Sequence, residues 1–238
     1  MTTTVRYARA WRSWRVDERS ARDPLVALTA SLDSLPLNEG RLIDLGCGDG
    51  SLLPMLIERG LSAENYVGLD ANAELLQASR ESDCPGARFE LWDARRKGDV
   101  DRLCLAAFAA DTYCASRLLC NLDDVSCSYL LRTLARCGEG SDFAFLDPID
   151  QVDDRGWHSG GDEPTPSKSL EDLLRSHQVD EAFRGAIAHR YSRTPDQYAA
   201  VLDRLGARDV TRIDLRRDSG ESEPTHAILR GRFRAGNP

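Results

Sequence analysis

The stretch Leu42–Gly50, LIDLGCGDG, decides the fold of this chain. Its first two residues form a short apolar run that predicts a buried parallel strand. Three glycines follow at every second position, Gly46, Gly48 and Gly50, and a helical pattern begins at Ser51. Glycines in such a turn let the backbone bend tightly and approach a ligand closely, because no Cβ stands in the way. A strand, a glycine turn and a helix N-terminus in this order predict a site for a nucleoside cofactor.

The composition is typical of a soluble globular protein. The 238 residues have a mass of 26.4 kDa, with 41% hydrophobic and 29% charged residues, which fits one domain with a sizeable core. The net charge of −8 and the pI near 5.1 argue against a nonspecific nucleic-acid surface. No apolar run approaches the roughly 20 residues needed to span a bilayer, and the N-terminus lacks the apolar core of a secretory signal. We therefore expect a cytoplasmic protein that contacts neither membrane nor nucleic acid.

The seven cysteines show no metal-binding pattern. Their number is odd, and no two of them form a C-x-x-C pair, so we expect no metal site. Several lie inside apolar runs, where a free cysteine behaves as a small hydrophobic residue. Reduced thiols fit the cytoplasmic location.

Strand-like and helix-like segments alternate along the chain after the glycine turn. This alternation predicts an α/β fold, a Rossmann-like, doubly wound and mostly parallel sheet of seven strands with helices on both faces. The last two strands, joined by a short acidic turn, predict an antiparallel C-terminal hairpin at one sheet edge. Strands are expected at 42–43, 66–70, 89–93, 112–115, 143–146, 210–215 and 225–230, and helices at 52–59, 74–82, 100–110, 123–137, 170–187 and 195–205.

Two segments lie outside this alternation, and we assign both to a single domain, 1–238. Residues 1–38 are mostly helical in pattern, with a second helix predicted to start at Asp23–Pro24, and form an N-terminal helical cap. Its aromatic residues are spaced four and three apart, so they either pack one helix face onto the domain or face a substrate. Residues 151–188 begin as a polar stretch rich in Gly and Pro, which predicts an insertion. The aromatic residues of the cap are Tyr7, Trp11 and Trp14.

Polar side chains fall at or just beyond the ends of four successive predicted strands. Ligands of such sheets bind outside the carboxyl ends of the strands, near the point where the strand order reverses. One acid at a strand end is usually a turn residue or a helix cap, and Asp70 and Asp93 could each be an N-cap. Three acids in corresponding positions favour a binding site. The four residues are Asp44, Asp70, Asp93 and Ser116.

Four pieces of sequence follow one another in a characteristic order and spacing: LIDLGCGDG at 42–50, YVGLDAN at 66–72, FELWDA at 89–94 and DTYCASRLLCNL at 111–122. Through them the chain resembles the class I S-adenosylmethionine-dependent methyltransferases over nearly its whole length. The first piece carries this family's leading pattern, D-x-G-x-G-x-G after a strand. The resemblance implies S-adenosyl-L-methionine as the cofactor, S-adenosyl-L-homocysteine as its product and a small-molecule methyl acceptor.

The resemblance also implies roles for the residues of the first and last pieces. Gly46, Cys47 and Gly48 would bring backbone against the aminoacyl part of the cofactor. Asp44 would organise the turn that carries them. Ser116, just past the fourth strand, would lie near the methionine portion or could be no more than a helix cap. Cys47 is expected to fill a tight turn as a small residue and not to act as a nucleophile.

The two middle pieces would bind the nucleoside. Asp70 would accept hydrogen bonds from both ribose hydroxyls, with Ala71 and Asn72 beside the adenine. Asp93 would accept from the adenine amino group, while Ala94 would offer a backbone N–H to the ring. A carboxylate suits two hydroxyl donors, and charge-assisted hydrogen bonds are the stronger kind.

The acceptor side has fewer candidates. Methyl transfer from a sulfonium is a direct displacement, so the protein mainly supplies alignment and desolvation. A base is needed only where the acceptor loses a proton; His189 is the first candidate, Asp147 the second, and His158 and His177 rank below them. We expect an O or N atom of a small molecule in a biosynthetic (natural-product) pathway to be methylated, under the insertion at 151–188. The protein would act as a monomer or homodimer.

Three other functions compete with this interpretation. An NAD-dependent oxidoreductase would need G-x-G-x-x-G, whose third glycine is replaced here by Ser51, and Asp93 favours the methyltransferase. A catalytically silent member of the fold that only binds the cofactor has the same donor-site residues. Base-modifying nucleic-acid methyltransferases carry a proline–aromatic motif after the fourth strand, which this chain lacks.

Overall fold

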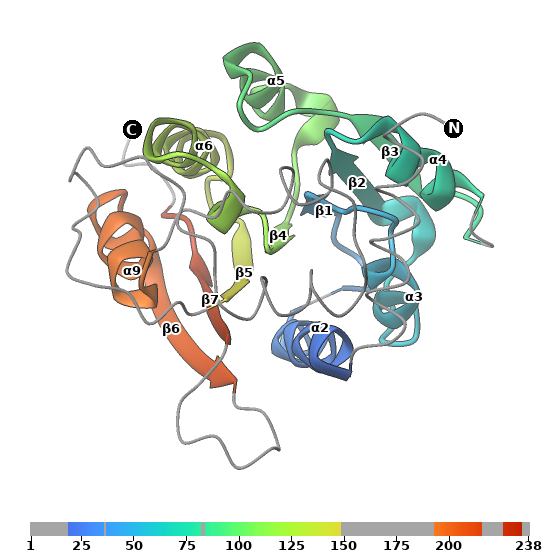
Figure 1. Ribbon diagram of the computed structural model, residues 1–238, viewed down its shortest axis with the longest axis horizontal. Helices are drawn as coiled ribbons and strands as arrows, with labels where there is room; N and C mark the ends of the chain where they lie inside the picture. The colour runs from blue at the N-terminus through green and yellow to red at the C-terminus, as the bar shows by residue number, and fades with distance from the viewer. Residues whose placement is uncertain (1–18, 36, 82–83, 149–192, 216–225, 235–238) are drawn as a thin grey trace, which may run out of the picture.

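The structure is a computed structural model, and it describes residues 19–35, 37–81, 84–148, 193–215 and 226–234. Seven strands form one sheet in the order β3-β2-β1-β4-β5-β7-β6 (Figure 1). Strands β1 to β5 are parallel to one another, and β7 runs antiparallel to both β5 and β6. The predicted mostly parallel, seven-stranded sheet with its antiparallel hairpin is confirmed. The strands are β1 Leu42–Leu45, β2 Tyr66–Asp70, β3 Arg88–Leu91, β4 Thr112–Ser116, β5 Asp142–Pro148, β6 Arg208–Leu215 and β7 His226–Arg232.

Helices cover both faces of the sheet (Figure 1). One core lies under α5, α6 and α9, and the other lies under α2 and α3. Side chains alternate across a strand, so Ile43 and Leu45 enter the first core while Leu42 enters the second. The α-helices are α2 Arg19–Ser31, α3 Leu52–Ile57, α4 Ala73–Arg80, α5 Lys97–Asp101, α6 Asp124–Cys137 and α9 Pro195–Arg204. The 3₁₀ turns are η1 Ala63–Asn65, η2 Arg102–Cys104, η3 Ala106–Phe108 and η4 Leu119–Asn121.

The segment 100–110 differs from the single helix that its pattern predicts. It consists of the end of α5 and the two turns η2 and η3, separated at Leu105, whose backbone is extended with φ −80° and ψ 146°. This break turns the chain so that Phe108 reaches the same core as Val100 and Leu103. Leu105 itself is exposed. Burial of three side chains has overridden the helical pattern.

Helix α2 begins at Arg19 and contains Pro24, so the predicted helix start at Asp23–Pro24 is wrong. Proline lacks one backbone N–H and usually weakens a helix interior. The buried residues Leu25, Leu28 and Leu32 are three and four apart and fix the helix against the sheet. This packed stripe compensates for the missing hydrogen bond.

The helix after the insertion was predicted closely. Thr194 caps α9, and its hydroxyl accepts from the backbone N–H of Gln197 at 3.2 Å. The Gln197 side chain in turn accepts from the Thr194 backbone N–H at 2.8 Å. This reciprocal capping box supports the N-terminus of α9, which packs onto the half of the sheet formed by β5, β7 and β6.

Candidate cofactor-binding site

The glycine turn after β1 has the backbone conformation that its glycines predict. Gly46, Gly48 and Gly50 have φ values of 74°, 59° and 74°, a region that side-chain-bearing residues avoid. The backbone N–H groups of Gly46 and Cys47 both donate to the Leu69 carbonyl, at 2.7 and 3.0 Å. Two amides of the turn therefore bind β2 and hold the turn against it.

The carboxylate of Asp70, the last residue of β2, connects two turns. One oxygen accepts from the Gly48 backbone N–H at 2.8 Å, and the other accepts from the Asn72 backbone N–H at 2.8 Å. The turn after β1 is thus held against the turn after β2 by one half-buried side chain. Each carboxylate oxygen can accept more than one hydrogen bond, and a carboxylate suits hydroxyl donors.

The N-cap of α4 is Asn72 and not Asp70. The Asn72 side chain accepts from the backbone N–H groups of Glu74 and Leu75, at 3.0 and 3.2 Å. The interpretation of Asp70 as a simple helix cap is therefore wrong. Asn72 has a structural role that the sequence did not indicate, and its neighbour Ala71 is exposed.

The loop after β3 carries Asp93 and Ala94. One Asp93 oxygen accepts from the Arg95 backbone N–H at 3.0 Å, and the other lies 3.6 Å from Arg96 Nε. Arg96 occupies the N-cap position of α5, so the helix-cap interpretation of Asp93 is also wrong. The Asp93 backbone N–H donates to the Asp99 carboxylate at 3.1 Å, which holds the loop to α5, and Ala94 is buried.

Asp44 lies inside the sheet, one residue before the end of β1. Its side chain is only 2% exposed, and it accepts from the Tyr66 hydroxyl at 2.7 Å. Burial, and then the Asp44 charge, raise the pKa values of Tyr66 and Cys114. Burial, followed by Asp44, also raises the pKa of Cys47. Cys47 is therefore a neutral thiol, as expected of a small residue that packs in the turn.

Ser116 ends β4, and its Oγ is buried without a hydrogen-bond partner among the described residues. A buried hydroxyl without a partner costs free energy, so such an atom indicates a ligand or an ordered water. Ser116 follows Ala115, which pairs with Leu45 immediately before the glycine turn. This hydroxyl fits a polar cofactor at the place where the sequence predicts the methionine portion.

A second polar cluster lies at the ends of β4, β5 and β7. Arg117 follows Ser116 with an unusual φ of 58° and is buried, and its Nη2 lies 3.4 Å from His226 Nε2. Asp147, on β5, is also buried, and its Oδ1 accepts from the Cys120 backbone N–H at 3.4 Å. Non-glycine residues with positive φ concentrate at functional sites.

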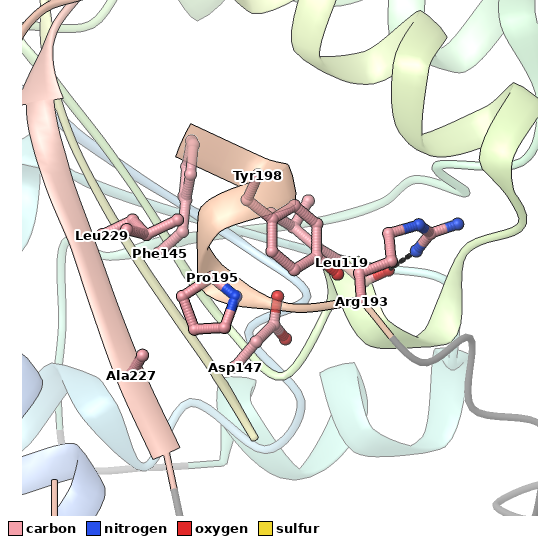
Figure 2. A pocket seen from close by; sticks show the side chains of 8 residues that line it. All are labelled: Leu119, Phe145, Asp147, Arg193, Pro195, Tyr198, Ala227 and Leu229. Carbon is pink, nitrogen blue, oxygen red and sulfur yellow. Dashed lines mark hydrogen bonds between the residues drawn. The ribbon is translucent and has the colours of Figure 1, made fainter. Parts of the chain in front are cut away.

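Beside this cluster, a small cavity opens between β5, β7 and α9 (Figure 2). Its volume of about 10 Å³ corresponds to roughly one water molecule, so it is too small for a methyl acceptor. Burial, and then the Asp147 charge, raise the pKa of Tyr198 well above its usual value. The residues that line the cavity are Leu119, Phe145, Asp147, Arg193, Pro195, Tyr198, Ala227 and Leu229.

Arg193 anchors the chain where it returns to the described fold. Its guanidinium donates to Asp124 at 2.6 Å and to the carbonyl groups of Leu119 and Leu122, at 3.1 and 2.8 Å. The Arg193 side chain is only 2% exposed. This one residue therefore joins the start of α9 to η4 and to the start of α6.

The comparisons with known proteins agree with this geometry. Residues 43–139 match the family model of a methyltransferase domain. Among solved structures, the CurJ carbon methyltransferase is similar, with a TM-score of 0.63 and 14% identity over 92% of this chain and 56% of that chain. A SAM-dependent methyltransferase from Thermotoga maritima has a TM-score of 0.61 and 14% identity over 96% and 97% of the two chains. Human N-acetylserotonin methyltransferase in complex with SAM has a TM-score of 0.51 and 19% identity over 87% and 51%.

Residues 43–139 match a methyltransferase domain, and the chain has the fold of solved S-adenosylmethionine-dependent methyltransferases. The resemblance to methyltransferases inferred from the sequence is thereby confirmed. At identities below 25%, the solved structures establish the fold. This methyltransferase spans 56% of the CurJ chain. No curated protein matches it in sequence.

Some predicted residues of this methyltransferase lie outside the described residues. These are His189, the first candidate base, as well as His158, His177, Tyr7, Trp11 and Trp14. Within the described ranges, no helix is long and apolar enough to cross a membrane. The same ranges hold no group of three or more His, Cys, Asp or Glu side chains that could hold a metal ion.

The sequence did not single out Arg117, Arg193 or Tyr198 of the methyltransferase. Arg193 gave one weak signal, since it directly precedes the cap residue Thr194. Arg117 gave another, since it directly follows Ser116 at a strand end. Burial of an arginine depends on contacts between distant segments, so no local pattern distinguishes these two from the other arginines of the chain.

Proposed function

We propose that this methyltransferase transfers the methyl group of S-adenosylmethionine to an oxygen or nitrogen atom of a small molecule in a biosynthetic pathway. The observation that carries the donor half of the proposal is the Asp70 carboxylate, which joins Gly48 to Asn72. It brings an acceptor-rich group to the junction of two strand ends, next to a glycine turn that a nucleoside can approach closely.

These contacts support a donor site for the nucleoside. Asp70 would accept from the two ribose hydroxyls, because a carboxylate can accept several hydrogen bonds. Asp93 would accept from the adenine amino group, and the buried Ala94 would line the ring. The Asp93 amide is already bound to Asp99, so the carboxylate is the group that this residue offers.

The methionine end of the cofactor would lie at the glycine turn. Gly46, Cys47 and Gly48 would bring backbone against it, and the buried Ser116 hydroxyl, which has no hydrogen-bond partner among the described residues, offers a donor and an acceptor. The bound cofactor supplies an electrophilic methyl group on a positively charged sulfur. The residues of this chain would hold it, exclude water and orient the acceptor in line.

The acceptor side of the proposal is supported by the ends of the segment that follows β5. Residues 151–188 would cover the acceptor, because Pro148 ends β5 at the carboxyl edge of the sheet and Arg193 is bound to η4 at the same edge. Residues 1–38 would form a helical cap within the same domain. His189 would serve as the base for an acceptor that must lose a proton, with Asp147 as the second candidate.

A small-molecule acceptor is supported by charge. The net charge of −8 disfavours the long-range attraction on which nucleic-acid binding depends. A location in the cytoplasm and a monomeric or homodimeric state complete the proposal.

The first test is thermal unfolding with and without saturating S-adenosylhomocysteine. A ligand at about 100 times its Kd stabilises a fold by roughly 2.7 kcal/mol, a readily measured shift. A shift with NADH in place of S-adenosylhomocysteine would contradict the donor site. Asp70→Ala tests the site itself, since this variant should lose the shift while keeping its circular dichroism spectrum.

The second test measures turnover with a panel of phenols, hydroxyl compounds and amines. The release of S-adenosylhomocysteine is the quantity measured. Binding of the cofactor without turnover of any acceptor would favour the silent member of the fold over the enzyme. Deletion of residues 151–168 should change turnover or acceptor choice. If neither changed, this segment would have no role over the acceptor.

A further inference from the structure

Two cysteines lie close together on the surface, away from the proposed cofactor site. Cys104 ends η2 and is exposed, and Cys137 ends α6 and is half-buried. The turn η2 packs directly against α6. Arg136, the residue before Cys137, donates from Nη2 to the Cys104 sulfur at 3.4 Å. The last turn of α6 therefore brings both a cation and a second thiol to the exposed cysteine.

The pair differs from most of the other cysteines of the chain. Cys47, Cys114, Cys120 and Cys127 are buried, and burial is the largest cause that raises the pKa values of three of them, Cys47, Cys114 and Cys127. Buried neutral thiols react slowly with oxidants, whereas an exposed thiol beside a guanidinium is a favoured site of reaction. Cys104 has both properties.

Cys137 faces groups from three elements. Its thiol donates to the Thr133 carbonyl at 2.8 Å, and Cys104 on η2, Arg136 on α6 and Tyr113 on β4 lie around it. Burial, and then Cys104, raise its pKa to about 12. Its raised pKa makes Cys137 a poor first nucleophile, and its position beside Cys104 makes it the thiol that can react second.

We propose that Cys104 and Cys137 are a modification site, at which a small-molecule disulfide such as oxidised glutathione forms a reversible intramolecular disulfide. The Cys104 thiolate attacks one sulfur of the small disulfide and releases the first small thiolate, which takes up a proton. The Cys137 thiol then loses its proton and attacks the Cys104 sulfur of the mixed disulfide, which releases the second small thiol. Two protein thiols are oxidised and one small disulfide is reduced to two thiols.

The bond would join α6 to a segment that shapes the predicted adenine loop. Helix α5 precedes η2, and its Asp99 accepts from the Asp93 backbone N–H and, through its carbonyl, from Trp92 Nε1 at 2.8 Å. Tyr129 of α6 already donates to Asp101 of α5 at 2.8 Å. The disulfide would strengthen an existing contact between α5, η2 and α6. Formation of this disulfide does not depend on methyl transfer.

The experiment is incubation of the full, reduced protein with oxidised glutathione, followed by alkylation and intact mass measurement. The product should weigh about 2 Da less than the reduced protein before alkylation, the mass of the two hydrogens lost. Peptide mapping should connect Cys104 to Cys137. A cross-link of this kind should also raise Tm, by about 5–10 °C, and a reducing agent should reverse both changes.

Three variants identify the steps. Cys137→Ser should stop at the mixed disulfide on Cys104, and Cys104→Ser should form neither product. Cys84→Ser is the matched control and should form the same disulfide as the protein without substitutions. In the protein without substitutions, Cys137 should resolve the mixed disulfide faster at pH 9 than at pH 7. The Cys137 thiol ionises poorly, so a higher pH increases the fraction of the attacking thiolate.

The proposal would be overturned by a mixed disulfide on Cys104 that Cys137 never resolves at either pH. It would also be overturned by a disulfide that maps to other cysteines, or by one that persists in Cys137→Ser. Since the readout is a mass and not an activity, these results are independent of whether the protein methylates any acceptor.

Discussion

The two halves of the carboxyl edge of the sheet are built differently. At the ends of β1, β2 and β3, short local turns meet, and the Asp70 carboxylate holds them through backbone amides. At the ends of β4, β5 and β7, buried side chains from distant parts of the chain meet, as Arg117 and His226 do. The first half has the features of a general nucleoside site. The second half is held together by contacts between side chains that lie far apart in the sequence.

The halves also differ in how charge is held. Asp70 is half-buried, and its carboxylate accepts from backbone N–H groups at the ends of two strands. Arg193 is 2% exposed and bound to Asp124 and two carbonyl groups, so its hydrogen bonds serve the fold. This comparison predicts that variants on the donor side lose binding, whereas variants on the acceptor side lose stability.

The largest effect is expected for Arg193→Ala. Removing Arg193 leaves the carbonyl groups of Leu119 and Leu122 and the partly exposed Asp124 carboxylate without this partner, and the free energy of unfolding should fall by about 3–5 kcal/mol. Urea unfolding measures this change, with Arg204→Ala as the control, because the exposed Arg204 side chain bonds only the Ala200 carbonyl of its own helix among the contacts observed. An equal free energy of unfolding for Arg193→Ala and Arg204→Ala would contradict the structural role of Arg193.

Asp70→Ala should mainly weaken cofactor binding. Loss of hydrogen bonds from two ribose hydroxyls to a carboxylate should cost about 2–4 kcal/mol, roughly a 30- to 1000-fold increase in the Kd of S-adenosylhomocysteine. Calorimetric titration measures it, and Asp49→Ala in the same turn should change the Kd little. A loss of fold by circular dichroism without a change in Kd for the folded fraction would make Asp70 a structural residue instead.

Two glycines offer a matched pair across the comparison. A Cβ at Gly68 would lie 2.8 Å from both the Cys47 sulfur and the Phe89 ring, and a Cβ at Gly231 would lie 2.8 Å from the Arg208 carbonyl oxygen. Overpacking of this kind costs about 1–3 kcal/mol, so both alanine variants should unfold at lower temperature. Only Gly68→Ala should also weaken S-adenosylhomocysteine binding, because it displaces the glycine turn. Equal loss of binding in both variants would remove the distinction.

The smallest effect is expected for Tyr66→Phe, which removes the hydroxyl bound to Asp44. The loss should be about 1 kcal/mol at pH 7. Burial, then the Asp44 charge, hold the folded pKa of Tyr66 well above 10.0, so above pH 10 the unfolded chain loses this proton first and the stability of the parent protein falls. This loss can reach about 1.4 kcal/mol per pH unit, and the variant should show a shallower fall. Urea unfolding from pH 9 to pH 11 gives the free energy of unfolding of both proteins at each pH. If it fell equally steeply with pH in the parent protein and in the variant, Tyr66 would ionise freely.

Much of the donor half was predictable because its determinants are local. The predicted strand at 66–70 has the same bounds as β2. Its own residues mark both ends, since a short apolar run stops at an acidic residue. The positive φ values at Gly46, Gly48 and Gly50 follow from steric limits that act on single residues. The helix start at Thr194 was likewise encoded by a capping residue and its partner three positions later.

Other details required knowledge of the neighbours. From the sequence alone, Asp70 and Asp93 could each have been the N-cap of the following helix. In the structure, Asn72 occupies the N-cap position of α4 and Arg96 that of α5. The pattern at 100–110 predicted one helix, and the burial of Phe108 produced separate turns. In both cases several local conformations were acceptable, and packing selected one.

The sequence by itself determined the parallel sheet, its antiparallel hairpin, the glycine turn and the acids at the strand ends, because backbone sterics and side-chain periodicity act over a few residues. Only the tertiary structure decided that β7 lies between β5 and β6, that Arg193 binds η4, and that Cys104 meets Cys137. These contacts join segments far apart in the chain. Their formation depends on the order of the strands and the space between helices, which no short stretch of residues specifies.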